Sequence, residues 1–481
     1  MSSYIILLVG LFLIWVFAYM VNGREIGSPA SIVCMMYVVT VLLCIYGYDA
    51  WNTVKLSITT ILILWAGCFF FTAGCMFAFH RREKGKICFQ NRNCLETERV
   101  FQVKTDLWII LVLFIAFLVI AYVRITSMKR IAAEAGMGGR GLTETAKWYR
   151  ENFSRLFSAG TVRAGTGETF IEKQILRFAS VIGNTITVIF FIGLSRKDKR
   201  TIWAAGAFLL VYAIYSIATE GGRAGVLYKA VIIIYGIYIL QIRKKIPNFS
   251  INRLFIATAI AGIVVALPMF YYSSALVGRK AGGDMMQYLS FYYGCGVPSL
   301  EMKIRDGIQA HPAGQNVFYG VYTLLYKIGI TDQLGGYAND WVDLNGYRSN
   351  VLTAWYRYYA DFGFAGVGVL SLIYGWLFTW LYRKVKEGEN LTAWCIFLAW
   401  GHSLFDLSRD DYLFGQYLGT APIINLVLSI LLVRIVCRPI KPEICFSRKK
   451  PEGAEETNYS VKILQRIKWL FRPEPIQFYC K

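Results

Sequence analysis

The chain has 481 residues, of which 56% are hydrophobic and 16% aromatic, and its mean hydropathy is +0.45. This composition is too apolar for an ordinary soluble enzyme and leaves room for many membrane-spanning helices. The net charge of +21 comes from basic residues in short runs between apolar segments. That arrangement follows the positive-inside rule of membrane proteins and argues against a nucleic-acid-binding protein.

The first segment, Met1–Val21, is expected to be a membrane span. It lacks the basic start and the small-residue cleavage site of a removable signal peptide. Further along the chain, apolar windows of about 17 to 23 residues predict further spans, eleven in total. They are Tyr4–Val21, Ser31–Tyr48, Ser57–Phe79, Leu107–Ile125, Ile175–Leu194, Thr201–Ala218, Val226–Ile242, Leu254–Tyr272, Phe364–Tyr382, Leu391–Leu407 and Ala421–Cys437. The expected fold class is therefore an all-α, polytopic integral membrane protein.

The eleven cysteines do not indicate a disulfide framework, because most of them lie within these apolar runs and are expected to pack as small buried side chains. His80, Cys88 and Cys94 match no standard spacing of zinc ligands. We therefore expect neither a disulfide-stapled fold nor a metal site.

The short loops predict the orientation. Eleven basic residues lie in one alternate set of loops against two in the other set, which places the basic loops in the cytoplasm. The basic set is Arg196, Lys197, Lys199, Arg200, Arg243, Lys244, Lys245, Arg253, Arg383, Lys384 and Lys386, and the opposite loops carry Arg223 and Arg409.

We expect residues 1–437 to form one transmembrane domain and residues 438–481 to form a basic cytoplasmic tail, in which Ser460–Phe471 predicts an amphipathic helix on the inner leaflet. Two long segments, 126–174 and 273–350, then face outward. The first contains the amphipathic stretch Leu142–Phe157, and the second is rich in aromatic residues. External loops of this length in a membrane protein usually carry function.

The sequence TEGGRAG, Thr219–Gly225, lies at the predicted outer end between the sixth and seventh spans. Its glycines allow close approach of the backbone to a ligand, and a helix is expected to start after Arg223. A helix amino terminus with a guanidinium favours binding of phosphate oxygens. A tight hairpin whose arginine reaches the membrane interface is the alternative.

Histidine is scarce, with three in the chain. His311, in DGIQAHPAGQNVFYGVY, is a candidate base for activating a sugar hydroxyl, and a solvated loop histidine is the alternative. His402 precedes Asp406 by four residues, so on a helix the two share a face, either for proton transfer or to satisfy each other in the bundle. His80 leads a charged run, and we expect it to be solvated.

The segment NGYRSNVLTAWYRYYADFGFAG runs from a polar, aromatic approach into a membrane span. Charged groups at such a boundary are costly unless they are paired or used. Arg348 and Arg357, with Asn350, are candidates for holding a pyrophosphate. For Asp361 we favour pairing or ligand orientation over direct catalysis. In the later loop Arg409, Asp410 and Asp411, we expect an exposed ion-pair cluster.

Known catalytic motifs of other classes are missing. The DFG at Asp361 lacks the accompanying kinase motifs, and there is no nucleotide-binding loop, HExxH or Gly-x-Ser-x-Gly. No acidic pair of the DxD type lies on a predicted cytoplasmic loop. These observations favour a metal-free reaction, without a cofactor, on an activated lipid-linked donor.

TEGGRAG, SFYYGCGVPSLEMKI, HPAGQNVFYGVY and NVLTAWYRYYADFGFAG together resemble motifs of the bacterial oligosaccharide repeat-unit polymerases, the Wzy-type O-antigen and capsule polymerases. The resemblance implies a polytopic, GT-C-like glycosyltransferase of the bacterial plasma membrane. It would transfer the growing chain to a new repeat unit on undecaprenyl pyrophosphate and release undecaprenyl pyrophosphate. Membrane lipids and a chain-length regulator are the implied partners.

In this hypothesis Arg223, with Arg348 or Arg357, binds the donor pyrophosphate, and His311 takes the proton from the acceptor. Asn350, Asp361 and the aromatic outer loops, including Tyr319, contribute to substrate binding. An O-antigen ligase and a flippase or other transporter are the alternatives. Transporters tend to show internal repeats and charges near the bilayer midplane, whereas charges here cluster at predicted outer helix ends.

Overall fold

The computed structural model describes residues 1–80, 101, 103–139, 141–142, 144–149, 169–220, 223–242, 284–307, 313–332, 341–387 and 390–439, with separate positions between 253 and 271. For His80 and Arg223 only the backbone is described. The predicted tail helix Ser460–Phe471 and most of the predicted span Leu254–Tyr272 lie outside the described residues.

Helices dominate the described part of the chain. They are α1 (Ser2–Val21), α2 (Pro29–Tyr46), α3 (Ile58–His80), α4 (Leu107–Glu134), α6 (Phe170–Arg196), α7 (Lys199–Glu220), α8 (Arg223–Ile242), α10 (Met285–Gly294), α11 (Gly296–Arg305), α12 (Tyr319–Lys327), α13 (Ala354–Glu387), α14 (Leu391–Trp400) and α15 (Thr420–Val436). A 3-10 segment, η1 (Gly401–Phe405), and a π-helical turn, η2 (Leu413–Tyr417), separate α14 from α15.

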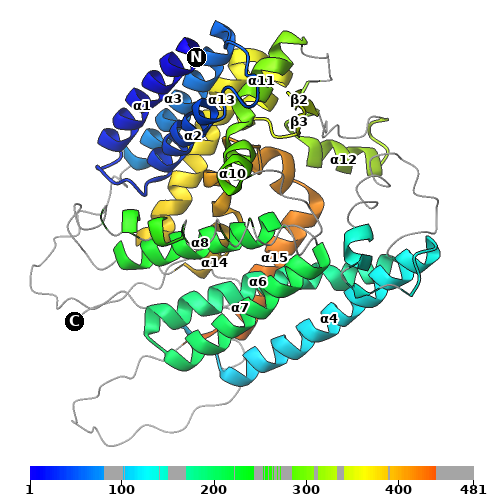
Figure 1. Cartoon of the computed structure of the whole chain (residues 1–481). Helices are drawn as coiled ribbons and strands as arrows, with labels where there is room; N and C mark the ends of the chain where they lie inside the picture. Colours follow the sequence, from blue (N-terminus) through cyan, green and yellow to red (C-terminus); the bar gives the residue numbers. More distant parts are fainter. Residues whose placement is uncertain are drawn as a thin grey trace, which may run out of the picture.

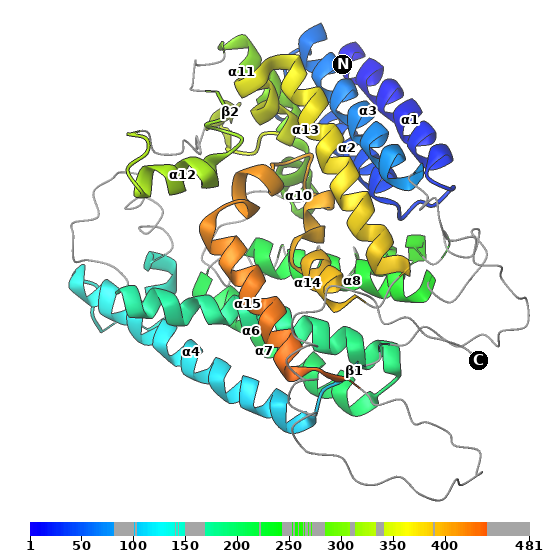
Figure 2. The same ribbon diagram turned by 180° about the vertical axis from the view of Figure 1, so that it is seen from behind.

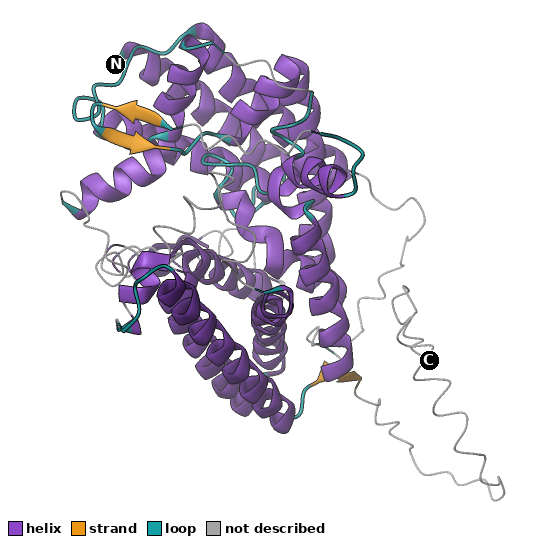
Figure 3. Ribbon diagram, turned by 90° about the vertical axis from the view of Figure 1, so that its right-hand side faces the viewer, coloured by secondary structure: helices purple, strands orange, loops and turns teal. Residues whose placement is uncertain are grey.

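Two short antiparallel pairs of strands accompany the helices (Figure 3). β1 (Val103–Lys104) pairs with β4 (Arg438–Pro439), and β2 (Val342–Leu344) pairs with β3 (Tyr347–Ser349). In the second pair, Asn345 and Gly346 both have positive φ, as a tight hairpin turn requires.

Among the described residues, eight helices are long and apolar enough to cross a membrane: α1, α2, α3, α4, α6, α7, α8 and α13. The protein is therefore a multi-pass helical membrane protein. Each of these helices falls on a predicted span, and the shorter apolar helices α14 with η1, and α15, fall on two more. The count of eleven spans stays a prediction.

α4 and α6 extend further than their predicted spans, into the segment 126–174. Arg130 near the end of α4 pairs with Glu134 at 2.8 Å and with Glu172 of α6 at 2.9 Å. Thr169 and Glu172 also form a capping box at the start of α6. These contacts stabilise helical backbone beyond the apolar windows, so α4 ends later and α6 begins earlier than hydropathy alone indicates.

The helices form two groups, which Figures 1 and 2 show from opposite sides. α1, α2, α3 and the long part of α13 pack together, and α4, α6, α7 and α15 make the second group. Close approaches between α3 and α13 are possible because Gly74 and Gly375 present no side chain to the facing backbone. α8 and α14 lie between the groups and contact both, and η1 contacts α2 of the first group as well as α8 and α14.

α13 is not one straight helix. Gly363 has φ 62° and ψ −154°, a backbone conformation available essentially to glycine alone, and it divides a short helix, Ala354–Phe362, from a long one that follows. The amino terminus of the short helix is buried: the Ala354 N–H donates to the Leu407 carbonyl at 3.0 Å, and Tyr37 in α2 donates to the same oxygen at 2.8 Å. Non-helical backbone is tolerated inside a membrane protein where other protein groups satisfy it in this way.

Two of the basic junctions predicted to be cytoplasmic lie at the same end of the described helices. Arg196, in the α6–α7 junction, donates to the Phe101 carbonyl at 3.3 Å, and the Phe101 ring lies 5.6 Å from that of Trp394 in α14. α14 follows directly after Arg383, Lys384 and Lys386 at the end of α13. We call this the inner end and the opposite one the outer end, following the predicted orientation.

The segment 284–307 is fastened to the outer end. Glu301 of α11 is fully buried and accepts from the Ser57 N–H at 2.9 Å and the Thr60 hydroxyl at 2.6 Å, at the start of α3. These bonds and Arg305 at 2.6 Å hold the pKa of Glu301 below its usual value against the opposing effect of burial. The Cys44 thiol also contacts the Gly294 carbonyl at 2.7 Å, which fixes the end of α10 against α2.

Candidate functional site

Two buried arginines from separate segments lie at the outer end, and each forms an ion pair with an aspartate. Arg357, in the first turn of α13, is 3% exposed and its Nε lies 2.7 Å from Oδ1 of Asp410. Arg409 is 7% exposed, and its Nη1 lies 3.0 Å from Oδ1 of Asp406. We call these four residues the arginine cluster.

The expectation of an exposed ion-pair cluster at Arg409–Asp411 is wrong. Arg409 and Asp411 are buried, and the ion pairs run to Asp406 and, from Asp410, to Arg357. The cause is the fold of residues 406–419, which do not form a surface loop. They return into the bundle between η1 and α15 and are covered by α10 and α13.

Two tyrosines of α10 surround the Arg409 guanidinium. Its central carbon lies 4.1 Å from the centre of the Tyr292 ring and 5.1 Å from that of Tyr293. These aromatic faces attract a cation. Interaction with Tyr292 and with Asp406 outweighs the effect of burial and raises the pKa of Arg409, so the side chain stays charged.

Arg409 keeps hydrogen-bonding capacity for a ligand. Its Nε is buried and has no partner among the described residues. The Thr353 and Ser408 hydroxyls, on either side of the buried start of α13, also lack hydrogen-bond partners among the described residues. Buried polar atoms without partners are rare in folded proteins, and a cluster of them indicates a place where water or a ligand binds.

A group of aromatic hydroxyls lies on the bundle side of the cluster. Tyr228 and Tyr412 share a hydrogen bond of 2.6 Å, and the Tyr228 ring stacks on His402 with centres 4.5 Å apart. The Tyr417 hydroxyl lies 3.0 Å from Nε2 of His402. The expected His402–Asp406 pairing is not what the structure shows, because the α-helix ends at Trp400 and the following 3-10 geometry separates residues four apart in sequence.

Asp411 holds the start of the π-helical turn η2. Its carboxylate accepts from the N–H groups of Leu413 at 3.0 Å, Phe414 at 3.3 Å and Gly415 at 3.1 Å. Burial and the neighbouring charge of Asp410 nevertheless raise the pKa of Asp411 to about 7. A carboxyl in this range exchanges its proton near neutral pH.

Asp361 fastens a loop to the short helix of α13. It accepts from the Asn316 N–H at 2.9 Å, the Asn316 side-chain amide at 2.8 Å and the Val317 N–H at 2.8 Å. Its hydrogen-bond partners in the described part of the chain therefore belong to this loop, and neither Arg348 nor Arg357 pairs with it. The bonds fix residues 313–318, directly after His311, next to the Gly363 break.

The other predicted site residues have different surroundings. Arg348 and Asn350 are exposed at the β2–β3 hairpin, and Tyr319 is half-buried at the start of α12. Arg223 is the first residue of α8, which agrees with the expected helix start, but its side chain lies outside what the structure describes. His311 also lies outside the described residues. The structure thus assembles Arg357 with residues that the sequence did not single out.

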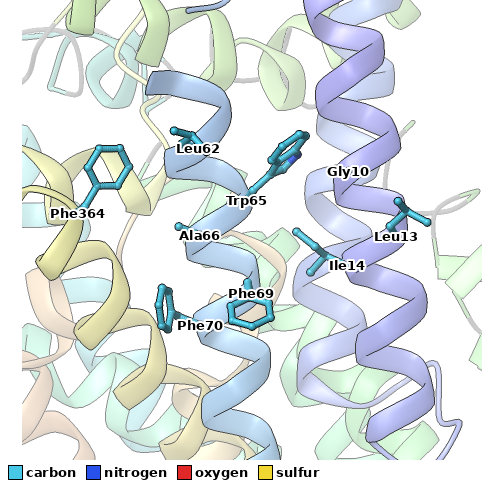
Figure 4. A pocket seen from close by; sticks show the side chains of 9 residues that line it. All are labelled: Gly10, Leu13, Ile14, Leu62, Trp65, Ala66, Phe69, Phe70 and Phe364. Atoms are coloured by element: carbon cyan, nitrogen blue, oxygen red, sulfur yellow. The ribbon is translucent and has the colours of Figure 1, made fainter. Parts of the chain in front are cut away.

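A wide apolar groove of about 730 Å³ lies on the outer surface of the first helix group, between α1, α3 and the long part of α13 (Figure 4). Trp65, Phe69 and Phe70 line it from α3, and Gly10 leaves space for the Trp65 ring. Phe364 closes one side, directly after the Gly363 break. The lining carries no charged side chain, as expected of a surface in contact with acyl chains.

The described residues include no group of three or more His, Cys, Asp or Glu side chains arranged to hold a metal ion. Comparisons with protein families, with curated proteins and with solved structures give no match for this chain.

Proposed function

We propose that the protein is a metal-independent glycosyltransferase of the bacterial plasma membrane that polymerises undecaprenyl-pyrophosphate-linked oligosaccharide repeat units, with a GT-C-like fold of about eleven spans. The observation that carries the proposal is the arginine cluster: two buried guanidinium groups from different segments, at the outer end, one of them with an unpartnered donor. Guanidinium groups bind phosphate oxygens with two parallel hydrogen bonds, and they stabilise charge that develops on a leaving diphosphate.

In this proposal Arg409 and Arg357 bind the diphosphate of the donor. The aromatic rings cover the face of the Arg409 guanidinium, so its edge, with the free Nε, is the part that meets oxygen. Arg223, at the start of α8, is a further candidate for the same group, through its side chain and the helix amino terminus. Arg348 and Asn350, exposed on the hairpin, and Tyr319 on α12 contribute to binding the sugars.

His311 is proposed to take the proton from the acceptor hydroxyl. Support comes from Asp361, whose three hydrogen bonds hold the backbone that follows His311 against the short helix bearing Arg357. The chemistry would transfer the growing chain from its carrier to the new repeat unit: a glycosidic bond forms as the bond to the diphosphate breaks, and undecaprenyl pyrophosphate leaves with its negative charge held by the arginines.

The test compares Arg409→Gln and Arg357→Gln with the unchanged protein in the host. We expect long polymer to disappear and single lipid-linked units to accumulate. Lys384→Gln is the matched control, because Lys384 lies on the same helix α13 but is exposed at the inner end. Wild-type chain-length ladders from both cluster variants would contradict the proposal.

A binding measurement separates lost chemistry from lost folding. Thermal unfolding of the purified full chain in detergent is recorded with undecaprenyl pyrophosphate and with undecaprenol, which lacks the diphosphate. We expect undecaprenyl pyrophosphate, but not undecaprenol, to raise the melting temperature. We expect undecaprenyl pyrophosphate to bind Arg409→Gln at least tenfold more weakly than the unchanged protein. A ligase with the same diphosphate site would give the same result, and transfer of glycan to a different acceptor in place of chain growth identifies that alternative.

One observation favours a transporter as the second candidate. The break of α13 at Gly363 resembles the discontinuous helices that line transport sites, and the cluster is buried inside the bundle. A flippase would move the lipid-linked unit across vesicles without forming longer chains. In vesicles whose lipid-linked substrate already lies in the leaflet at the outer end of the protein, no transport step is needed. Formation of polymer by the purified protein in such vesicles would exclude a pure transporter.

A further inference from the structure

A lysine lies inside the helix bundle, away from both ends. Lys229 is the seventh residue of α8, within an apolar window, and its ammonium group donates to Oδ1 of Asn184. Asn184 is close to the middle of the 27-residue helix α6. A charged side chain at this depth is costly in a membrane protein and marks a functional site by default.

The charge of Lys229 has no acidic partner in the described part of the chain. The nearby carboxylates are already engaged: Asp406 by Arg409, Asp410 by Arg357 and Asp411 by three backbone N–H groups. An ammonium group has three donors, and one is used by Asn184. Among the described residues, two donors and the positive charge of Lys229 therefore have no partner.

Polar side chains continue from Lys229 toward α15. The Asn184 amide donates to Ser429 at 3.4 Å, and the Asn425 amide donates to Ser180 at 3.1 Å. Oδ1 of Asn425 is buried without a partner. Unsatisfied donors and an unsatisfied acceptor thus lie along the same interface of α6, α8 and α15, which is the arrangement of a polar binding site and unlike that of a closed apolar core.

The lysine is also connected to the arginine cluster. Its neighbour Tyr228 bonds Tyr412 and stacks on His402 in η1, and Tyr412 follows Asp410 and Asp411 directly. Lys229 itself is half-buried, although its ammonium group contacts α6.

We propose that Lys229 binds an anionic oxygen group, a carboxylate or a phosphate, of a ligand whose diphosphate end reaches the arginine cluster. The nature of that ligand rests on the proposed function. The anion would come either from an acidic sugar of the repeat unit or from the phosphate of the lipid carrier. The remaining N–H donors of the ammonium group would meet the anion, whereas Oδ1 of Asn425 can only accept a hydrogen bond, for example from a hydroxyl of the same ligand.

The experiment measures binding to the purified full chain in detergent at low salt, without any polymer formation. The probes are undecaprenyl pyrophosphate, undecaprenyl phosphate and glucuronate, with glucose as the uncharged control. We expect Lys229→Gln to weaken binding of at least one anionic probe about tenfold, and Lys229→Arg to retain most of it. Lys199→Gln is the matched control, since Lys199 is exposed at the start of α7.

The probes separate the two sources of the anion. Weaker binding of glucuronate assigns Lys229 to an acidic sugar, whereas weaker binding of the undecaprenyl phosphates alone assigns it to the carrier. Unchanged binding of every anionic probe by Lys229→Gln overturns the proposal. Because no chain growth is needed, this result is independent of whether Arg409→Gln abolishes polymer, so a failure of the proposed function is recognised separately.

Stability gives a second readout. If the lysine is a binding residue with an uncompensated charge, Lys229→Met removes that charge and raises the melting temperature of the ligand-free protein. A structural lysine would behave in the opposite way, because Asn184 would lose a needed partner. A lower melting temperature together with unchanged anion binding would assign Lys229 to the scaffold and end the proposal.

Discussion

Buried charges occur at both ends of the bundle, but their surroundings differ. At the inner end, Glu25 is 7% exposed and accepts from Lys386 at 2.5 Å, from Tyr238 at 3.1 Å and from Tyr382. These contacts join the α1–α2 junction to α8 and α13. At the outer end, the arginine cluster pairs its charges, yet the Arg409 Nε and the Thr353 and Ser408 hydroxyls have no hydrogen-bond partner in the described part of the chain.

The difference separates a structural contact from a binding site. A buried charge whose hydrogen bonds are all formed within the protein fixes one arrangement of helices. A buried charge surrounded by unsatisfied donors costs free energy in the absence of a ligand, and that cost is accepted where binding needs it. The four predictions below test this contrast, beginning with the largest effect.

Arg357→Ala is expected to have the largest effect on stability. It leaves the partly buried Asp410 without this ion pair; breaking a fully buried pair costs about 3–5 kcal/mol, so the partial exposure of Asp410 puts the expected loss at the lower end of that range. Reversible unfolding in mixed micelles measures the loss. Replacing both residues, Arg357→Met with Asp410→Leu, should recover most of it. A loss as small as that of the exposed control Lys384→Ala, within about 0.5 kcal/mol, would show that the pair contributes no more than a surface residue.

Asp411 is expected to make stability depend on pH. The folded protein retains this proton up to about pH 7, whereas an unfolded chain releases it near pH 4. Between these values the folded state binds more protons, so the contribution of Asp411 is favourable at low pH and is lost as pH rises. The melting temperature of the unchanged protein should fall across this window relative to Asp411→Asn. Parallel pH profiles for the two proteins would contradict the assignment.

The sequence predicted the membrane-spanning architecture well, because hydropathy over a whole helix is a strong and local signal. It also identified Arg357 as a charge at a boundary. The sequence could not show that Ala354–Phe362 is a separate short helix. The residues on both sides of Gly363 are apolar or aromatic, so the pattern does not change at the break. The long helix does begin at Phe364, where the span was predicted.

Arg409 was misjudged for a different reason. Three consecutive charged residues after an apolar run are typical of a surface loop, and the sequence holds no local sign of their burial. Tyr292 and Tyr293, which cover Arg409, come from a distant segment that Glu301 fastens to α3. Lys229 was the available signal that went unused, since a lysine within an apolar window indicates function in a membrane protein.

Gly363→Ala is expected to destabilise the protein by about 1–3 kcal/mol, because φ 62° with ψ −154° is strained for any residue that has a Cβ. A Cβ there meets no atom within 4 Å, so the loss would come from the backbone alone. Gly368→Ala is the matched control on the same helix, where the nearest atom, in Phe70, lies at an ordinary 3.5 Å. That variant should be neutral or slightly stabilising by helix propensity. Equal effects from both variants would show that the break is not fixed by Gly363.

Glu25→Gln is expected to have the smallest effect and to test the contrast between the two ends directly. Gln retains the shape and an acceptor for Tyr238 and Tyr382, and loses the charge that pairs with the partly exposed Lys386. The expected loss is about 1 kcal/mol of stability with binding of undecaprenyl pyrophosphate unchanged. Unfolding in mixed micelles and the binding measurement are made on the same preparation. The contradicting result is that Glu25→Gln weakens binding as strongly as Arg409→Gln. In that case a charge with all its hydrogen bonds formed would matter to the ligand as much as one with a free donor. Satisfied hydrogen bonding would then not distinguish a structural contact from a binding site.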